Sequence, residues 1–460
     1  MTVQQDNRRG LPRTDRVIAH PRLSDVRSQL GTHATTTLVR AAIHASRDRA
    51  KGGGGPATED DVVELTRIAA NRWLGRRTRR VINATGVVLH TNLGRAPLGA
   101  RVTEALAREA GRYVSLELDL ESGKRGGRAA FAEYALTSLT GAEAALVVNN
   151  NAAGVLLALA SVALGQGVLV SRGELVEIGG GFRVPEVLAR SGAHLVEVGT
   201  TNRTRVEDYA NALADRTDIA AILRVHPGNF RQIGFVHRPT LGELVKLGRS
   251  KGIAIVEDLG GGALVEVAGL AGDPTVAESV AAGPDIVTFS TDKILGGPQG
   301  GALVGSAKAI DVARKDPLAR ALRLGRLPLV ALEATLGHYL AGELDAIPSL
   351  FLTRRSPAEL EGRAARWAAT LGHGTRVVKL SALTGGGTYA EETIPSVGIA
   401  IDDPDPEALL TLLRRGTPSV VARVEDGTVL CDARTVLPAE DGEFLGALSS
   451  ALAARSKAHR

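Results

Sequence analysis

The sequence has 460 residues, of which 44% are hydrophobic, 23% charged and 3% aromatic, with 54 glycines and a formal net charge of +5. This composition is ordinary for a globular protein of two to three domains, and neither a signal peptide nor an apolar run of about 18 residues is present. The single cysteine, Cys431, excludes an intramolecular disulfide and a multi-cysteine zinc site, so we expect a cytoplasmic protein without a bound metal.

Residues 1–80 are predicted to form a basic helical domain with a linker. They carry 16 Lys and Arg against 8 Asp and Glu, a net charge of +8, so that the rest of the chain sums to −3. Residues 35–50 are amphipathic, Gly52–Gly55 indicate a linker, and Thr58 precedes acidic residues that suit a helix N-terminus. The charge asymmetry suggests nucleic acid as a partner, although a solvated basic region explains it equally well.

Residues 81–340 alternate between apolar strands and helical segments. The expected strands include residues 144–150, 252–258 and 285–290, and residues 153–164 form an expected helix. This alternation predicts an α/β domain with a mostly parallel sheet covered by helices on both faces. Residues 341–460 show a different pattern, typical of a smaller α+β domain.

Polar residues follow three of the expected strands: Asn149–Asn151, Glu257–Asp258 and Asp292–Lys293. In a parallel sheet the carboxyl ends of the strands form the ligand-binding edge, so these residues are expected to converge. Lys293 stands between two apolar runs, followed by a Gly-Gly-Pro turn. An ordinary surface lysine in a loop is the alternative interpretation for Lys293 taken alone.

Together these strand ends suggest a site for pyridoxal phosphate. Lys293 supplies an amine for a Schiff base with the cofactor aldehyde, and Asp258 supplies a carboxylate for the pyridine nitrogen. The turn Asn150, Asn151, Ala152 opens a helix, whose N-terminus is an anion site suited to the cofactor phosphate. Taken alone, Asp258 is better explained as a turn cap and Asn149–Asn151 as a polar turn.

Longer motifs resemble the bacterial selenocysteine synthases, the L-seryl-tRNA(Sec) selenium transferases. The resemblance covers nearly the whole chain and rests on INATGVVLHTNLGRAPL (82–98), LDLESGKRGGR (118–128), VVNNNAAGVLLAL (147–159), SRGELVEIGGGFRVPEV (171–187), EVGTTNRTRVEDY (197–209), VEDLGGGALV (256–265) and FSTDKILGGPQGG (289–301). It implies an aminotransferase-like, fold type I, pyridoxal 5'-phosphate-dependent transferase. Small-residue departures from the family pattern, at Thr291, Gly261 and Gly300, affect the fine structure of loops only.

The resemblance also implies a reaction. The seryl amine of seryl-tRNA(Sec) displaces Lys293 from the cofactor aldimine, the α-proton and the β-hydroxyl leave to give aminoacrylyl-tRNA, and selenium from selenophosphate adds. The released Lys293 is the natural proton carrier. By the same resemblance, residues 1–80 bind the tRNA, and the enzyme is a homodecamer built as a pentamer of dimers.

Further site residues come from the same resemblance. Arg95, Arg320 and Arg323 match the arginines that the family uses for the donor anion, and in this family the last two can serve a neighbouring subunit; a solvated helix face is the alternative. Asp292 either tunes the lysine or braces its loop. Glu177, with Gly179–Gly181, matches a segment near the cofactor ring, and His226 is a candidate neighbour of the cofactor.

Two other functions remain open at this stage. The first is a lyase of the same family that acts on a small amino acid or amino sugar, against which the basic extension argues. The second is a non-catalytic nucleic-acid-binding protein on a degenerate enzyme fold, against which the joint presence of Lys293, Asp258 and the arginines argues.

Overall fold

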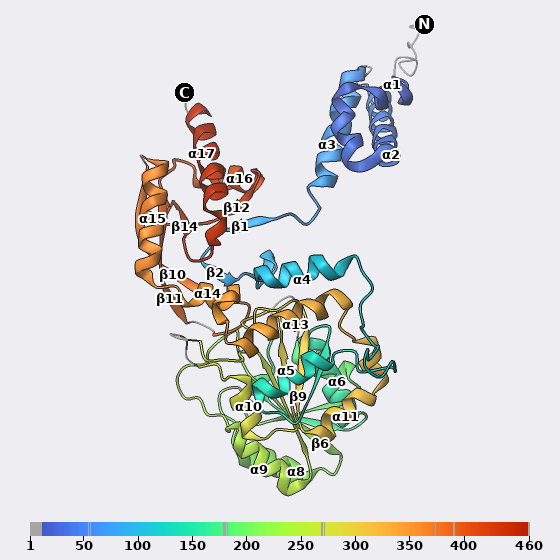
Figure 1. Ribbon diagram of the computed structural model, residues 1–460, viewed down its shortest axis with the longest axis vertical. Helices are drawn as coiled ribbons and strands as arrows, with labels where there is room; N and C mark the ends of the chain where they lie inside the picture. The colour runs from blue at the N-terminus through green and yellow to red at the C-terminus, as the bar shows by residue number, and fades with distance from the viewer. Residues whose placement is uncertain are drawn as a thin grey trace. The chain divides into compact units, whose positions relative to one another are not determined.

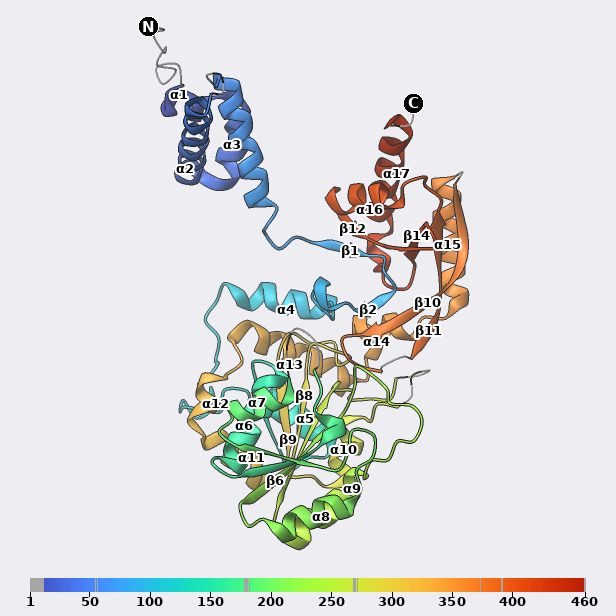
Figure 2. The same cartoon turned by 180° about the vertical axis from the view of Figure 1, so that it is seen from behind.

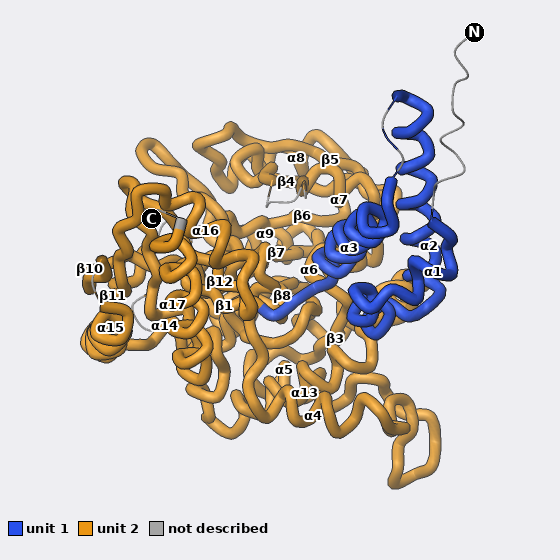
Figure 3. The backbone as a smooth tube through the Cα atoms, turned by 90° about the horizontal axis from the view of Figure 1, so that it is seen from above, with its two compact units in different colours: residues 1–80 blue, residues 81–460 orange. Residues whose placement is uncertain are grey.

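The computed structural model describes residues 12–53, 55, 57–177, 181, 183–267, 270, 272–372, 374–389 and 392–458. The chain forms two compact units, residues 1–80 and residues 81–460, which are coloured blue and orange in Figure 3. Across the described ranges, every helix is too short or too polar to span a lipid bilayer.

The first unit is a small helical bundle. It comprises α1 (Thr14–Ala19), α2 (Ser24–Lys51) and α3 (Glu59–Leu74), packed around buried aliphatic residues that include Val39, Val62 and Val63. Thr58 begins α3 as expected: its hydroxyl accepts from the Asp61 N–H at 3.2 Å, while the Asp61 carboxylate accepts from the Thr58 N–H at 2.8 Å. Within the expected linker, Gly54 and Pro56 lie outside the described residues.

A seven-stranded sheet forms the centre of the second unit, in the order β3-β9-β8-β7-β6-β4-β5. Only β9 runs antiparallel to its neighbours, β3 and β8, and the other pairs are parallel. This confirms the predicted α/β class with a mostly parallel sheet. The strands are β3 (Ala144–Val148), β4 (Gly167–Ser171), β5 (His194–Val198), β6 (Ile219–Val225), β7 (Ala254–Gly260), β8 (Ile286–Ser290) and β9 (Gly301–Gly305).

Helices cover both faces of this sheet (Figures 1 and 2). Side chains along β3 point alternately to the two faces of the sheet. Leu146 and Val148 belong to one apolar core, and Ala145 and Val147 belong to the core on the other face. The first core contains α6 (Asn151–Ala163), α7 (Val184–Arg190) and α11 (Ala307–Lys315). Residues of the opposite face come from α5 (Ala130–Thr140), α8 (Val206–Asp215), α9 (Leu241–Lys251), α10 (Val276–Ala282) and α13 (Arg326–Ala341).

The C-terminal part has its own sheet and core. Its elements are α14 (Pro348–Arg354), α15 (Pro357–Leu371), β10 (Thr375–Gly385), β11 (Thr393–Ile401), α16 (Pro406–Arg415), β12 (Ser419–Val421), β13 (Arg423–Glu425), β14 (Thr428–Asp432) and α17 (Asp441–Ala458). Two strands from the start of the second unit pair with strands of this part: β1 (Val81–Asn83) with β12, and β2 (Val87–Leu89) with β10. The remaining helices are α4 (Ala100–Ala110) and α12 (Pro317–Ala321).

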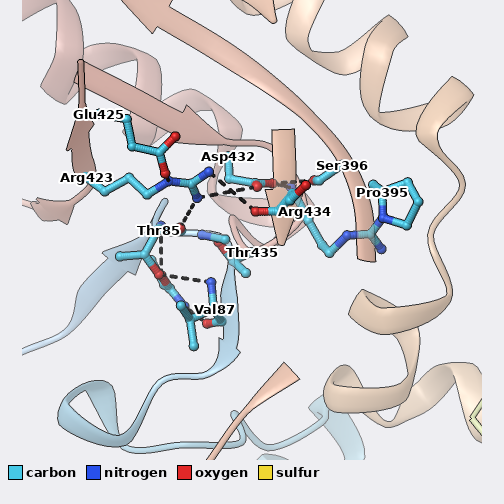
Figure 4. A network of polar contacts seen from close by, with 12 residues as sticks. Thr85, Val87, Pro395, Ser396, Arg423, Glu425, Asp432, Arg434 and Thr435 are labelled. Atoms are coloured by element: carbon cyan, nitrogen blue, oxygen red, sulfur yellow. Dashed lines mark hydrogen bonds and ion pairs between the residues drawn. The ribbon is translucent and has the colours of Figure 1, made fainter. Parts of the chain in front are cut away.

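A network of hydrogen bonds joins the β1–β2 connection to residues of the C-terminal sheet (Figure 4). Asp432, which is fully buried, accepts from the Ser396 hydroxyl at 2.6 Å and from the Arg434 N–H at 2.9 Å. The Gly86 N–H donates to Thr435 Oγ1 at 3.0 Å, and Arg423 donates to the Thr85 carbonyl. Because this network joins residues about 350 positions apart, it holds the segment leading to Arg95 in place.

Candidate active site

A cavity of about 700 Å³ lies at the carboxyl ends of β7 and β8 and the N-terminus of α6. Seven of the residues singled out from the sequence line it together: Arg95, Asn150, Asn151, Ala152, Asp258, Asp292 and Lys293. The expected convergence of the three strand ends therefore occurs in one cavity.

Lys293 lies in the short connection between the antiparallel strands β8 and β9. The loop is closed by the Gly296 N–H to the Lys293 carbonyl at 2.9 Å and by Thr291 N–H to the Gly300 carbonyl at 3.0 Å. Lys293 is only 6% exposed, and its Nζ makes no hydrogen bond or ion pair with any residue in the described ranges. Burial lowers the pKa of this amine, an effect that Asp258 opposes and Arg95 reinforces.

Asp258 lies on β7 with its side chain on the α6 face of the sheet, like Val256 two residues earlier. It is 2% exposed, and its Oδ1 accepts from Asn151 Nδ2 at 2.8 Å. Burial raises the pKa of this carboxyl, whereas the Asn151 hydrogen bond and the charge of Lys293 favour the ionised form. A cationic ring nitrogen beside it would stabilise the carboxylate further.

The N-terminus of α6 opens onto the same cavity. Asn150 caps the helix, since its side-chain oxygen accepts from the Ala153 N–H at 2.8 Å. The side-chain oxygen of Asn150 is therefore occupied by the helix cap. The N–H groups of Asn151 and Ala152, in the first turn of the helix, have no partner within the helix. Oδ1 of Asn149 and Oδ1 of Asn151 are buried without a hydrogen-bond partner in the described structure.

Arg95 and Asp292, which both line the cavity, form an ion pair with Nη1 and Oδ2 2.6 Å apart. Arg95 has a φ of 63°, a conformation that non-glycine residues rarely adopt and that is enriched at functional sites. Its N–H donates to the His90 carbonyl at 3.1 Å, and the Ala96 N–H donates to the Asp292 carbonyl at 3.4 Å. Asp292 therefore braces the segment that carries Arg95.

These features fit pyridoxal phosphate. The buried, unpartnered amine of Lys293 suits an aldehyde, the carboxylate of Asp258 suits a ring nitrogen, and the α6 N-terminus suits a phosphate. Gly260 adds a steric argument: a Cβ there would stand 3.8 Å from Lys293 Nζ and 4.0 Å from Asp258 Oδ1, in the space between the two groups.

The lowered pKa of Lys293 leads to a pH prediction for cofactor capture. Only the neutral amine attacks an aldehyde, so the capture rate of the apo-protein should fall as pH drops through the lysine pKa, with a midpoint below the ordinary value of 10.5. Arg95→Gln removes a positive charge and should raise that midpoint; Asp258→Asn removes a negative charge and should lower it. Stopped-flow absorbance, recorded over a range of pH, measures the midpoints of the wild type and of the two variants. A wild-type midpoint at the ordinary lysine pKa would contradict the assignment of Lys293 as a buried amine.

Arg320 and Arg323 line a different cavity, of about 400 Å³, rather than the one around Lys293. Arg323 Nη1 lies 3.2 Å from Glu117 Oε1, and Arg320 makes no hydrogen bond or ion pair with any residue that the structure describes. The Asn149 N–H nevertheless donates to the Leu322 carbonyl at 2.9 Å, so both arginines lie close to the same edge of the sheet.

His226 and Glu177 also lie outside the lysine cavity. His226 follows β6 and lines a third cavity, with its Nε2 2.9 Å from Asp273 Oδ1, while its N–H donates to the Asp258 carbonyl at 2.9 Å. Glu177 is exposed and pairs with Arg183 at 2.8 Å. Of the adjoining Gly179–Gly181, only Gly181 falls within the described residues.

Sequence reasoning missed two acids near the site, the buried Glu174 and the partly buried Asp273. Glu174 is fully buried, accepts from Arg224 Nη1 at 2.6 Å and from the Val225 N–H at 2.9 Å, and so fixes the end of β6. Asp273 binds both His226 and the N–H of Tyr389. Asp273 precedes a proline and looks like a simple turn residue, and Tyr389 lies 116 positions away, so no local pattern pointed to their contact.

Comparisons with known proteins agree with this geometry. Residues 81–437 match the family model described as L-seryl-tRNA selenium transferase, and residues 8–47 match the model for the N terminus of selenocysteine synthase. The chain is similar to the L-seryl-tRNA(Sec) selenium transferases of Moorella thermoacetica (45% identical, covering 96% of this chain and 97% of the relative) and Geobacter sulfurreducens (43%, covering 95% and 98%). A solved D-glucosaminate-6-phosphate ammonia-lyase shares the fold, with a TM-score of 0.58 at 21% identity, covering 84% of this chain and 98% of that one.

Proposed function

The chain belongs to the L-seryl-tRNA selenium transferase family, and we propose that it converts L-seryl-tRNA(Sec) to L-selenocysteinyl-tRNA(Sec) in the cytoplasm, with pyridoxal 5'-phosphate as cofactor and selenophosphate as selenium donor. The observation that carries this proposal is the cavity that unites the unpartnered Lys293, Asp258 and the α6 N-terminus. The two named relatives match it over more than nine tenths of its length.

When bound, pyridoxal phosphate draws electrons from the α-carbon of the seryl group, which allows the α-proton and the β-hydroxyl to leave. The residues of this chain do the rest. Lys293 holds the cofactor aldehyde through Nζ and, once the substrate amine has replaced it, carries the α-proton on that nitrogen. Its lowered pKa suits this work, because a larger fraction of the amine is neutral, and so able to accept a proton, than in an ordinary lysine at the same pH.

Asp258, Asn151 and the α6 N-terminus orient the cofactor. The Asn151 amide holds one oxygen of Asp258, so the other oxygen is available for the ring nitrogen. The unpaired N–H groups at the start of α6 bind the phosphate. Arg95, which also lines the cavity, supplies a positive charge for the donor anion, and its ion pair with Asp292 holds the guanidinium in place.

Arg320 and Arg323 complete the anion site of a neighbouring subunit in this proposal. They lie apart from the lysine cavity of their own chain, yet Arg320 is free of partners among the described residues and both are at the sheet edge. A homo-oligomer in which these arginines reach an adjacent cavity explains that arrangement. The homodecamer built of five dimers is the assembly that the family resemblance implies.

Mixed oligomers test this sharing of the site. We expect Lys293→Ala protein and Arg320→Gln/Arg323→Gln protein each to be inactive alone. Activity should fall by at least ~10³-fold in the former, since it lacks the covalent anchor, and by at least ~10²-fold in the latter, since it lacks the charges for the donor anion. Co-expressed in one oligomer, the two proteins should regain part of the activity, because some sites receive an intact Lys293 and intact arginines. Failure to complement, with oligomer formation verified by mass, would place the arginines in the site of their own chain.

The alternative of a small-molecule lyase is tested by changing the substrate. The holoenzyme is given free L-serine, an amino-sugar phosphate or seryl-tRNA(Sec) without selenophosphate. Elimination is followed by ammonia release for all three substrates and, for the two serine substrates, by pyruvate recovered after hydrolysis of any tRNA ester. The proposal expects turnover with the tRNA-linked serine only. Efficient turnover of either small substrate would instead favour the lyase, and the match of residues 8–47 to the selenocysteine synthase N-terminal model would then lack an explanation.

A further inference from the structure

Asp273 joins two segments of the second unit that are far apart in sequence. Its Oδ1 lies 2.9 Å from His226 Nε2, and its Oδ2 accepts from the Tyr389 N–H at 2.7 Å. The side chains of Asp273 and His226 are 12% and 17% exposed, so both contacts are largely shielded from water. Because an ionised carboxylate only accepts, His226 must carry its proton on Nε2 in this contact.

This pair borders the wall of the lysine cavity. The His226 N–H donates to the Asp258 carbonyl at 2.9 Å, which ties the end of β6 to the residue expected to face the cofactor ring. A Cβ on Gly261 would lie 3.8 Å from Asp273 Oδ2 and 3.3 Å from Thr388 Cγ2, whereas one on the preceding Gly260 would lie 3.8 Å from Lys293 Nζ. Two adjacent glycines thus separate Lys293 from Asp273.

The turn that Asp273 holds contains four residues with positive φ, one of which is not a glycine. Gly385, Gly386 and Gly387 have φ values of 76°, 66° and 71°, and Tyr389, a non-glycine residue, has a φ of 51°. Tyr389 is 4% exposed and belongs to the same apolar core as Leu259 on β7. A non-glycine residue keeps such a conformation only where the surroundings impose it. The hydrogen bond from Tyr389 to Asp273 is one such constraint.

We propose that Asp273 is a positioning residue of the active site: one carboxylate oxygen fixes the His226 ring beside Asp258, and the other holds the 385–389 turn against the Gly260–Gly261 wall behind Lys293. It touches neither substrate nor cofactor, and it acts through His226 and the turn. The effect on turnover rests on the proposed function, whereas the effects on the turn and on the bound cofactor do not.

Two substitutions separate the roles of the two oxygens. Asp273→Ala removes both contacts. Asp273→Asn leaves an amide oxygen for the Tyr389 N–H, but its amide nitrogen now donates to His226 and reverses that hydrogen bond. In Asp273→Ala holoenzyme we expect kcat to fall roughly 10²-fold, the loss typical of a misplaced catalytic group, with little change in KM for seryl-tRNA(Sec). The absorption band of the bound cofactor should shift, and the Tyr389 amide should exchange hydrogen faster.

In Asp273→Asn the Tyr389 amide should stay protected, and kcat and the cofactor band should lie between those of the wild type and of Asp273→Ala. The control is Glu343→Gln, which removes the charge from another His–carboxylate pair, His338 Nδ1 to Glu343 Oε2 at 2.9 Å, in which the histidine is buried, away from the lysine cavity. It should leave kcat and the cofactor band unchanged.

The proposal is overturned if Asp273→Ala lowers the unfolding temperature but leaves kcat per bound cofactor and the cofactor band as in the wild type. It is also overturned if Glu343→Gln, at the same loss of stability as Asp273→Ala, changes kcat per bound cofactor and the cofactor band to the same extent. Should Asp273→Ala not fold, Asp273→Asn decides alone: an altered band with lower kcat supports the proposal, and wild-type values refute it. If the wild-type enzyme makes no selenocysteine, the proposed function fails. The cofactor band and the hydrogen exchange of the Tyr389 amide still test the positioning role of Asp273, so failure of the function and failure of this role are distinguishable.

Discussion

Lys293→Ala is expected to abolish formation of selenocysteinyl-tRNA(Sec), with a loss of at least ~10³-fold, because the covalent anchor and the proton carrier disappear together. The purified variant should also lack the absorption band near ~420 nm that reports a cofactor held by a lysine amine. No other lysine lines the cavity, so no neighbouring amine within the described lining can substitute. The measurement is the absorption spectrum, followed by single-turnover assays.

Lys308→Ala is the matched control, since Lys308 is an exposed lysine on α11 outside the lysine cavity. It should retain the band and the activity. The assignment of Lys293 is wrong if Lys293→Ala keeps the band, or if it loses activity while still holding the cofactor through an amine. Because the variant also removes a buried basic group whose charged form is disfavoured, its apo form should be at least as stable as the wild-type apo-protein.

If residues 1–80 bind the tRNA as proposed, deleting residues 1–75 should weaken tRNA(Sec) binding by on the order of 100-fold or more, because the phosphate contacts of this basic unit would be lost. The deletion removes α1, α2 and α3 and ends before β1, which begins at Val81 and pairs within the second unit. The remaining unit keeps its sheets and cores, so it should still bind pyridoxal phosphate. Binding is measured by filter retention or anisotropy at several salt concentrations.

Salt dependence provides the internal control for this deletion. The affinity of the full chain should fall steeply as salt rises, and the truncated protein should show a shallower slope, because fewer counterions are released. Unchanged affinity and unchanged slope after truncation would remove residues 1–80 from the tRNA-binding surface. A truncated protein that has also lost the cofactor band would indicate misfolding, and the slope would then have to be measured on charge-reversed variants of the intact chain.

The convergence of the strand ends in one cavity could be predicted from the sequence because its signals are local. The strands that end at Val148, Gly260 and Ser290 are recognisable from apolar runs, and a mostly parallel sheet brings the carboxyl ends of its strands together in space. The capping pattern at Thr58 likewise predicted the start of α3. The roles of Arg95, Arg320 and Arg323 came from the family resemblance alone, since isolated arginines carry no spacing signal.

Long-range contacts were beyond the reach of sequence patterns. Nothing in residues 81–89 shows that β1 and β2 pair with strands more than 290 positions later. Likewise, the contact of Asp273 with Tyr389 depends on how the β10–β11 connection folds back onto β6 and β7. Glu174 was passed over because a single acid in a polar motif looks exposed, whereas its partners Arg224 and Val225 lie about 50 positions away. The domain boundary at residue 340 and the individual site roles stay predictions.

The central claim is the conversion of serine to selenocysteine on tRNA(Sec), and one measurement tests it most directly. Purified holoenzyme is incubated with seryl-tRNA(Sec) and selenophosphate, and the amino acid released from the tRNA is identified by mass spectrometry. The account predicts selenocysteine, formed only when enzyme, cofactor and selenophosphate are all present. Recovery of unchanged serine from enzyme whose cofactor band is intact would contradict it.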